Sequence, residues 1–148
     1  MSKVLALNGD NNVGKSTTIY ELIKLFPKDC VKEVNSYRLY KNNPRKYPEV
    51  SVVVNYKGKT ICITTKGDDP KCVLKEIKAF KENGYNPYKC DLFVCASRCS
   101  GDLVKHLLKN FDKKVFVTKE DVKVISKRDS ACREKAKELF KEVLYLIK

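Results

Sequence analysis

The sequence predicts an α/β protein in which helices pack on both faces of one mostly parallel β-sheet, giving a three-layer αβα sandwich. Short apolar segments typical of strands alternate along the chain with longer segments whose apolar residues recur at helical spacing. Residues 91–96 form a continuous apolar run, as expected of a central strand buried on both faces. A tight turn at residues 56–59 joins neighbouring strands into a hairpin, so one strand of the sheet is expected to be antiparallel.

The predicted elements are, in order, a strand at 4–7, a helix at 17–26, hairpin strands at 50–55 and 60–65, a helix from 70 to 82, a strand at 91–96, a helix after residue 100, a strand at 114–118 and a helix at 130–147. The helix at 70–82 has Asp69 as its predicted cap, Pro70 in its first turn and Gly84 just after its end. The polar segment 29–49 is predicted to be a long loop, and residues 122–125 can add a short strand.

The most informative segment lies between the first strand and the first helix. It fits the pattern GxxxxGK[ST] at every position, and its residues are Gly9, Asp10, Asn11, Asn12, Val13, Gly14, Lys15 and Ser16. The pattern and its placement resemble the Walker A motif of the P-loop NTPases. The resemblance implies a single nucleotide-binding domain over residues 1–148, with the P-loop NTPase fold and a site for Mg²⁺ and a nucleoside triphosphate.

Each part of this motif has a predicted role. The amides of residues 11–15 and the positive end of the following helix would surround the phosphates. Lys15 would contact the β- and γ-phosphates, the Ser16 hydroxyl would ligate Mg²⁺, and Thr17 completes the predicted nucleotide-binding residues. The alternative is a glycine-rich turn with an incidental lysine, and the position between a strand and a helix argues against it.

Residues that follow two other strands are candidates for catalysis together with Lys15. Asp68 follows the hairpin and is predicted to help hold Mg²⁺, although a solvated turn residue is an equal alternative. Arg98 follows the strand at 91–96 and is predicted to stabilise negative charge on a phosphate, as an arginine finger in cis would. A surface arginine is the alternative for Arg98.

The composition limits the classes of partner. The net charge of +13 attracts anions, whether nucleotides, phosphorylated substrates or nucleic acid, and does not choose among them. Basic residues and tyrosines alternate in segment 32–59, which is therefore the predicted site for a phosphorylated or nucleotide second substrate, with Arg38 and Arg45 as its anion contacts. A solvated loop is the alternative interpretation of this segment.

The sequence also predicts a cytoplasmic protein without a membrane segment. No apolar run approaches the ~20 residues that a membrane span needs, and no secretory leader is recognisable at the start of the chain. The sequence has 7 cysteines, an odd number, and no CxxC pair. This favours reduced thiols over disulfides or a metal site.

ATP is the expected nucleotide, in preference to GTP. The hairpin and the segment 118–121 resemble the small GTPases, whose TKxD variant of the guanine-reading motif would give Asp121 hydrogen bonds from guanine. However, Thr64 stands where the aspartate of that family's DxxG motif belongs, ahead of Gly67. The sequence therefore predicts Mg²⁺-dependent binding and hydrolysis of ATP. It leaves open a small-molecule or nucleotide kinase, a GTPase-like protein, and a non-catalytic protein that binds ATP to hold or release a partner.

Overall fold

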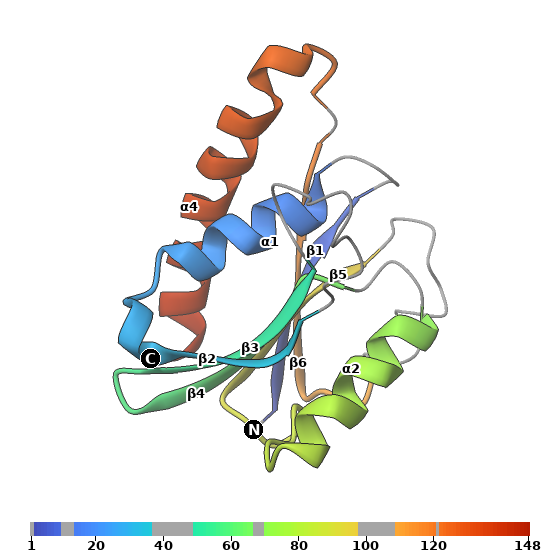
Figure 1. Cartoon of the computed structure of the whole chain (residues 1–148), viewed down its shortest axis with the longest axis vertical. Coiled ribbons are helices and arrows are strands. Elements are labelled where there is room, and N and C mark those ends of the chain that lie inside the picture. The colour runs from blue at the N-terminus through green and yellow to red at the C-terminus, as the bar shows by residue number, and fades with distance from the viewer. Residues whose placement is uncertain (1, 10–13, 37–48, 67–69, 98–108, 121) are drawn as a thin grey trace.

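One mixed β-sheet with the strand order β2-β3-β4-β5-β1-β6 runs through the chain (Figure 1). The computed structural model describes residues 2–9, 14–36, 49–66, 70–97, 109–120 and 122–148. Within these residues the strands are β1 (Lys3–Asn8), β2 (Val31–Ser36), β3 (Val50–Tyr56), β4 (Lys59–Thr64), β5 (Leu92–Ser97) and β6 (Lys113–Thr118).

The sheet is mostly parallel, as predicted. β4 pairs in parallel with β5, and β1 pairs in parallel with both β5 and β6. β3 is antiparallel to β4, which confirms the predicted hairpin. Lys57 and Gly58 have φ angles of 52° and 76°, so the turn between β3 and β4 has the positive φ values that match the twist of its strands.

β2 lies inside the segment 29–49 that was predicted to be a loop, so this part of the prediction is wrong. β2 is at the edge of the sheet and pairs antiparallel with β3 alone among the described strands. Its apolar residues are Val31 and Val34, and its register with β3 shifts between Glu33 and Asn35. An irregular edge strand that buries one side needs little apolar sequence, which explains why the pattern of this segment suggested a loop.

The helices of the described chain are α1 (Lys15–Lys24), α2 (Pro70–Glu82) and α4 (Arg128–Leu146), and the short 3₁₀ helices are η1 (Lys28–Cys30) and η2 (Ile125–Lys127). The strand predicted at 122–125 is wrong, because residues 122–124 pair with no described strand and η2 begins at Ile125. Instead, the Val122 carbonyl accepts a hydrogen bond of 2.9 Å from Arg128 Nε, which links this segment to the first residue of α4. The predicted cap Asp69 and the helix predicted after residue 100 lie outside the described residues.

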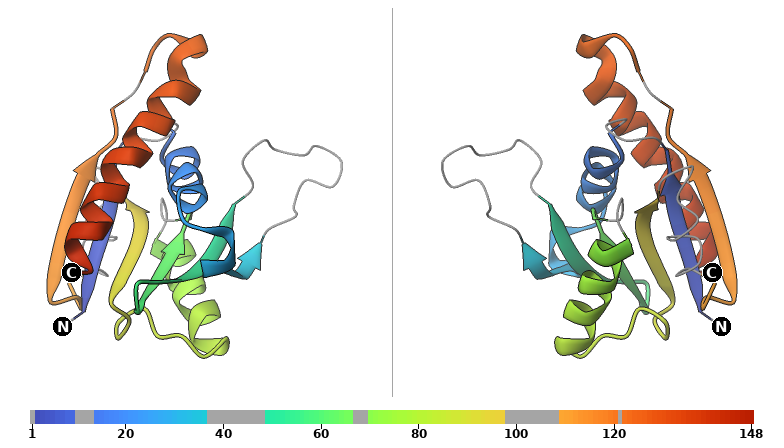
Figure 2. Two further views of the ribbon diagram at one scale, coloured as in Figure 1. Left: turned by 90° about the vertical axis from the view of Figure 1, so that its left-hand side faces the viewer. Right: turned by 90° about the vertical axis from the view of Figure 1, so that its right-hand side faces the viewer.

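Helices cover both faces of the sheet (Figure 2), and their apolar side chains pack against it. On one face, α1 and α4 pack against each other and over Leu5, Leu7 and Val94. On the other face, α2 packs over Val53 and Phe93. β5 is buried along its whole length, as predicted for a central strand. None of the described helices combines the length and the apolar character that crossing a membrane requires.

The parallel strands end at one edge of the sheet, which we call the carboxyl edge and which contains Asn8, Thr64, Ser97 and Thr118. Asn8 is in register with Ser97 on one side and with Thr118 on the other. Chain segments that leave β1, β5 and β6 therefore start next to one another. The opposite edge, where these strands begin, is called the amino edge.

Packing of α4 on α1 is expected to contribute strongly to stability. Leu139 lies at 0% exposure in this interface, so Leu139→Ala leaves a cavity and should lower the free energy of unfolding by about 2–5 kcal/mol. Urea unfolding followed by circular dichroism measures this loss. Arg133→Ala, an exposed position of the same helix, serves as the control and should change stability by less than about 0.5 kcal/mol. Equal effects of the two substitutions would contradict the described packing.

Candidate functional site

The start of α1 differs from that of most helices. Gly14 precedes the helix in the left-handed conformation, with φ of 92°, and among the described residues no side chain caps it. Its first turn also contains no acidic residue. Most helices satisfy the free N–H groups of their first turn with a Ser, Thr, Asp or Asn side chain. A helix start of this kind presents N–H donors and the positive end of the helix dipole to an anion.

Lys15 turns back from this helix to the carboxyl edge. Its side chain is 3% exposed, and its ammonium donates hydrogen bonds to the carbonyls of Gly9 (2.7 Å) and Ser97 (3.0 Å). The Ser97 carbonyl also accepts from the Gly9 N–H at 3.1 Å. The two ends of the predicted phosphate loop are therefore held together, and the lysine lies where β1 and β5 end.

Ser16 connects the start of α1 with the end of β4. Its hydroxyl donates to the Thr65 carbonyl at 3.1 Å, although β5 lies between β1 and β4 in the sheet. Thr65 is the first residue after β4 and precedes the candidate Asp68 by three positions. The structure thus brings one predicted Mg²⁺ ligand to the chain segment that leads to the other.

Several predicted site residues lie outside the described residues, namely Asp10, Asn11, Asn12, Val13, Asp68 and Arg98. The residues that flank them are described. Ser97, directly before Arg98, contacts the Lys15 ammonium through its carbonyl and donates from its hydroxyl to Asn8 Oδ1 at 3.1 Å. The chain therefore leaves β5 toward Arg98 immediately beside Lys15.

A pocket of about 210 Å³ adjoins the end of the motif, and it is lined by Gly14, Thr17, Lys119, Val122, Arg128, Asp129 and Cys132. Lys119 is 5% exposed; its backbone N–H donates to the Asn8 carbonyl at 2.6 Å and its ammonium to the Glu120 carbonyl at 2.7 Å. Lys119 belongs to the segment 118–121 that resembles TKxD, whereas Asp121 lies outside the described residues. The pocket combines a carboxylate, Asp129, with the cations Lys119 and Arg128 beside the α1 N-terminus.

Cys132 joins α4 to this pocket, a role that its place in the apolar pattern of the helix did not indicate. Its sulfur lies 3.6 Å from the Gly14 carbonyl oxygen. A Cβ atom added at Gly14 would come within 2.9 Å of the same sulfur, which is closer than real Cβ contacts. Glycine is thus required at position 14 both for its positive φ and for the approach of Cys132.

A buried carboxylate beside the end of β4 is a second feature that sequence reasoning missed. Glu76 of α2 is 1% exposed, accepts from Ser51 Oγ at 2.7 Å and pairs with Lys66 Nζ at 3.3 Å. The Lys66 N–H donates to Thr64 Oγ1 at 3.2 Å. The sequence did contain a sign of this cluster, because Glu76 lies between Val73 and Ile77 on the apolar side of its helix. This cluster fixes the chain just before the segment that contains Asp68.

The predicted second-substrate site at 32–59 has a different structure where it is described. Residues 32–36 belong to β2 rather than to the predicted loop, and residues 50–56 belong to β3, in agreement with the predicted hairpin strand. Residues 37–48, including Arg38 and Arg45, lie outside the described residues. The Tyr56 ring packs edge-on against Phe26 at 5.5 Å between centroids, so it is part of the core.

Among the described residues, no group of three or more His, Cys, Asp or Glu side chains could hold a metal ion. The Ser16 hydroxyl is the predicted Mg²⁺ ligand that the structure describes, and it lies at the uncapped start of α1. A hydroxyl beside bound phosphates suits Mg²⁺, which usually takes few protein ligands and keeps several waters.

No family model matches the chain, and comparisons with curated proteins and with solved structures find no match.

Substitution of Gly14 should be costly for two separable reasons. Gly14→Ala forces a Cβ atom into a positive-φ position and against the Cys132 sulfur. Gly84→Ala is the matched control, because Gly84 has φ of 89° and nothing within 4 Å of its added Cβ. We expect Gly14→Ala to cost about 1–3 kcal/mol more than Gly84→Ala in urea unfolding. Adding Cys132→Ala should reduce the difference, and its failure to do so would show that the sulfur does not restrict position 14.

Breaking the buried ion pair at Glu76 should destabilise the end of β4. Glu76→Gln keeps the shape of the side chain but removes the negative charge that pairs with Lys66, which is 11% exposed. We expect a loss of about 1–3 kcal/mol in unfolding free energy, against less than about 0.5 kcal/mol for the exposed Glu82→Gln on the same helix. Similar stabilities of the two variants would contradict the described cluster.

Proposed function

We propose that this protein is a P-loop nucleoside triphosphatase with the corresponding three-layer fold, which binds a nucleoside triphosphate with Mg²⁺ and hydrolyses it. The observation that supports this most is the uncapped start of α1, where Gly14 has a positive φ and Lys15 turns back to the carboxyl edge. A glycine before a helix and a lysine directly after it are the groups that a phosphate loop needs. Both are held in place by described contacts.

Lys15 acts in this proposal as the main positive charge for the terminal phosphates. An ammonium has three donor positions, and carbonyl contacts such as those to Gly9 and Ser97 fix its place without neutralising its charge. The first-turn amides of α1 add donors that need no rearrangement. Binding energy would thus come from groups that the fold has already positioned.

Ser16 and Asp68 would hold the magnesium ion, and Arg98 would stabilise negative charge. Bound Mg²⁺ would bridge phosphate oxygens and neutralise part of their charge. The position of Ser16 beside Thr65, and of Ser97 beside Lys15, supports the two assignments, because each places the start of the relevant segment at the carboxyl edge. Asp68 and Arg98 themselves remain predictions from the sequence.

ATP is the proposed substrate because the chain lacks the DxxG aspartate. Thr64, at that position, is 0% exposed, and its Oγ1 lies 2.8 Å from Ser51 Oγ, within hydrogen-bond distance. This buried residue offers no carboxylate to a ligand. GTP is the second candidate, and the pocket beside Lys119 favours it. Guanine presents adjacent N–H donors, and the carboxylate predicted to accept them is Asp121 of the TKxD-like segment that contains Lys119.

A kinase and a non-catalytic binding protein remain the alternatives to hydrolysis. Phosphate release from nucleotide and Mg²⁺ alone supports a hydrolase. Production of diphosphate only after addition of a nucleoside monophosphate or a sugar supports a kinase, and binding without turnover supports the third class. A malachite-green phosphate assay and chromatography of the nucleotides distinguish these results.

Lys15→Ala should abolish stabilisation by nucleotide while leaving the fold intact. At a ligand concentration about 100 times Kd, binding to the unchanged protein adds about 2.7 kcal/mol and should raise Tm by about 5 °C or more. Thermal unfolding with ATP, GTP and their diphosphates, with and without Mg²⁺, measures the effect. Lys24→Ala, at the exposed end of the same helix, is the control and should keep the full shift. An equal shift by ATP in the Lys15 variant would contradict the proposal.

A further inference from the structure

The amino edge, at the opposite end of the sheet from the phosphate loop, has a distinct surface. β4 begins there at Lys59 and β6 at Lys113, while α2 and α4 run toward it and end there. Figure 1 shows the two chain ends, the β3–β4 turn and the end of α2 together at this end of the molecule. Segments far apart in the sequence therefore meet at this end of the sheet, with α2 on one face and α4 on the other.

Exposed lysines dominate this surface, and we call them the basic surface: Lys28, Lys57, Lys81, Lys89, Lys113, Lys114 and Lys148. Two nearby acidic side chains form hydrogen bonds with backbone N–H groups. Asp91 Oδ2 accepts from the Thr60 N–H at 2.8 Å, and Asp112 Oδ2 accepts from the Ser2 N–H at 2.9 Å. Other described acids near this edge, such as Asp29, Glu33, Glu82 and Glu142, are fewer than the lysines. The surface is thus strongly positive.

Tyrosine rings lie among these lysines. The Tyr145 side chain is 63% exposed, and the ammonium groups of Lys113 and Lys148 each lie 5.8 Å from the centre of its ring. The Tyr85 ring has Lys32 at 5.7 Å, and the Tyr88 ring has Lys81 at 5.2 Å. Each ring thus combines a flat face with a neighbouring positive charge.

A hollow of about 210 Å³ lies at the same edge and is lined by Thr60, Gly84, Tyr85, Asn86, Lys89, Cys90 and Asp91. It brings together an aromatic ring, an amide and an ammonium. These groups can respectively stack on a base, hydrogen-bond its edge and neutralise a phosphate. The hollow is therefore suited to one unit of a polymer whose phosphates follow the lysines.

We propose that the basic surface binds single-stranded nucleic acid, with phosphates on its lysines and bases stacked on Tyr85 and Tyr145. A net charge of +13 favours a polyanion in general, and the interleaved tyrosines favour one with accessible bases. A membrane surface would be expected to meet a cluster of apolar side chains. Of the exposed large apolar residues in the described chain, Leu25 and Tyr145 are those at this edge. The site is separate from the nucleotide site.

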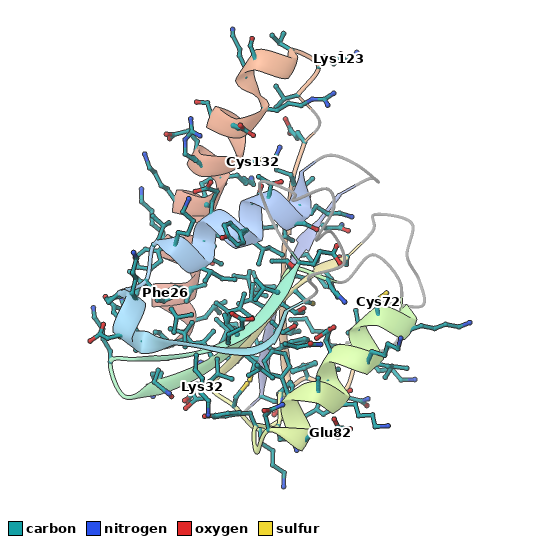
Figure 3. All side chains as sticks on the ribbon, viewed as in Figure 1. Phe26, Lys32, Cys72, Glu82, Lys123 and Cys132 are labelled. Atoms are coloured by element: carbon teal, nitrogen blue, oxygen red, sulfur yellow. The ribbon has the colours of Figure 1, made fainter. Side chains whose placement is uncertain are left out.

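Binding of fluorescein-labelled (dT)₂₀ to the full chain, followed by fluorescence anisotropy, tests the proposal. If about four phosphates are contacted, affinity should fall roughly 50-fold between 50 and 200 mM salt. Lys89→Glu with Lys113→Glu should lower affinity at least tenfold. The matched control is Lys123→Glu with Lys127→Glu, which changes the charge equally at exposed positions near the start of α4 (Figure 3) and should cost less than threefold. Equal losses in the two double variants would overturn the proposal.

Tyr145 separates stacking from charge. Because its side chain is exposed, Tyr145→Ala should leave the fold intact and weaken (dT)₂₀ binding about tenfold, whereas Tyr145→Phe should keep it. Equal binding by all three proteins would overturn the stacking role. Binding to phosphatidylserine vesicles but not to (dT)₂₀ would assign the surface to membranes instead. Lys15→Ala should bind (dT)₂₀ normally, so that this test is independent of the nucleotide site.

Cysteines of the chain provide a second readout. Cys90 lines the hollow and is partly exposed, so iodoacetamide can reach its thiol. Bound (dT)₂₀ should protect Cys90 from iodoacetamide, as measured by mass spectrometry. Cys72, near the other end of α2 (Figure 3), should stay unprotected. Burial raises the pKa of Cys95 to about 12, so it should not react in either state. Protection of Cys72 as strong as that of Cys90 would contradict the proposed location.

Discussion

The position of the Lys15 ammonium determines how the carboxyl edge is built. Removing an ammonium from water costs several kcal/mol unless hydrogen bonds replace its hydration. Here the carbonyls of Gly9 and Ser97 supply them, and the same Ser97 carbonyl accepts from the Gly9 N–H. The lysine therefore joins the ends of β1 and β5 across neighbouring strands. A group that we propose for phosphate binding thus also helps to hold the strands that carry it.

Local patterns were enough to predict most of the fold. The glycine and lysine of the motif marked the boundary between β1 and α1, and the continuous apolar run of residues 91–96 identified the buried β5. β2 could not be predicted in this way, because an edge strand that contains a bulge needs few apolar residues. The prediction for residues 122–125 failed in the opposite direction, because a strand was predicted and the structure has none there. The segment instead leads through η2 to α4, and Arg128 of α4 donates a hydrogen bond back to it.

The candidate site was predictable only where its residues are close in sequence. Lys15 and Ser16 follow from the motif, whereas their partners Ser97 and Thr65 are separated from them by 82 and 49 residues. The approach of Cys132 to Gly14 spans 118 residues, and a helical pattern reports such a cysteine simply as part of the core. Glu76 is different, because an acid on the apolar side of a helix signals a buried partner. The identity of that partner, Lys66, requires the folded chain.

The contact between Ser16 and Thr65 has a consequence for any ligand of the α1 N-terminus. A ligand that takes the Ser16 hydroxyl competes with the Thr65 carbonyl, and Thr65 is fixed to β3, where its hydroxyl accepts from the Val50 N–H at 2.9 Å. The next residue, Lys66, pairs with Glu76 of α2, and α2 ends at the amino edge. Contiguity of this kind does not by itself establish coupling between the two ends. Coupling, where it exists, is reciprocal: a triphosphate that changes the affinity for nucleic acid must have its own affinity changed by the same factor. Transmission between the two ends would require a second arrangement of α2, one in which the ion pair between Glu76 and Lys66 is changed.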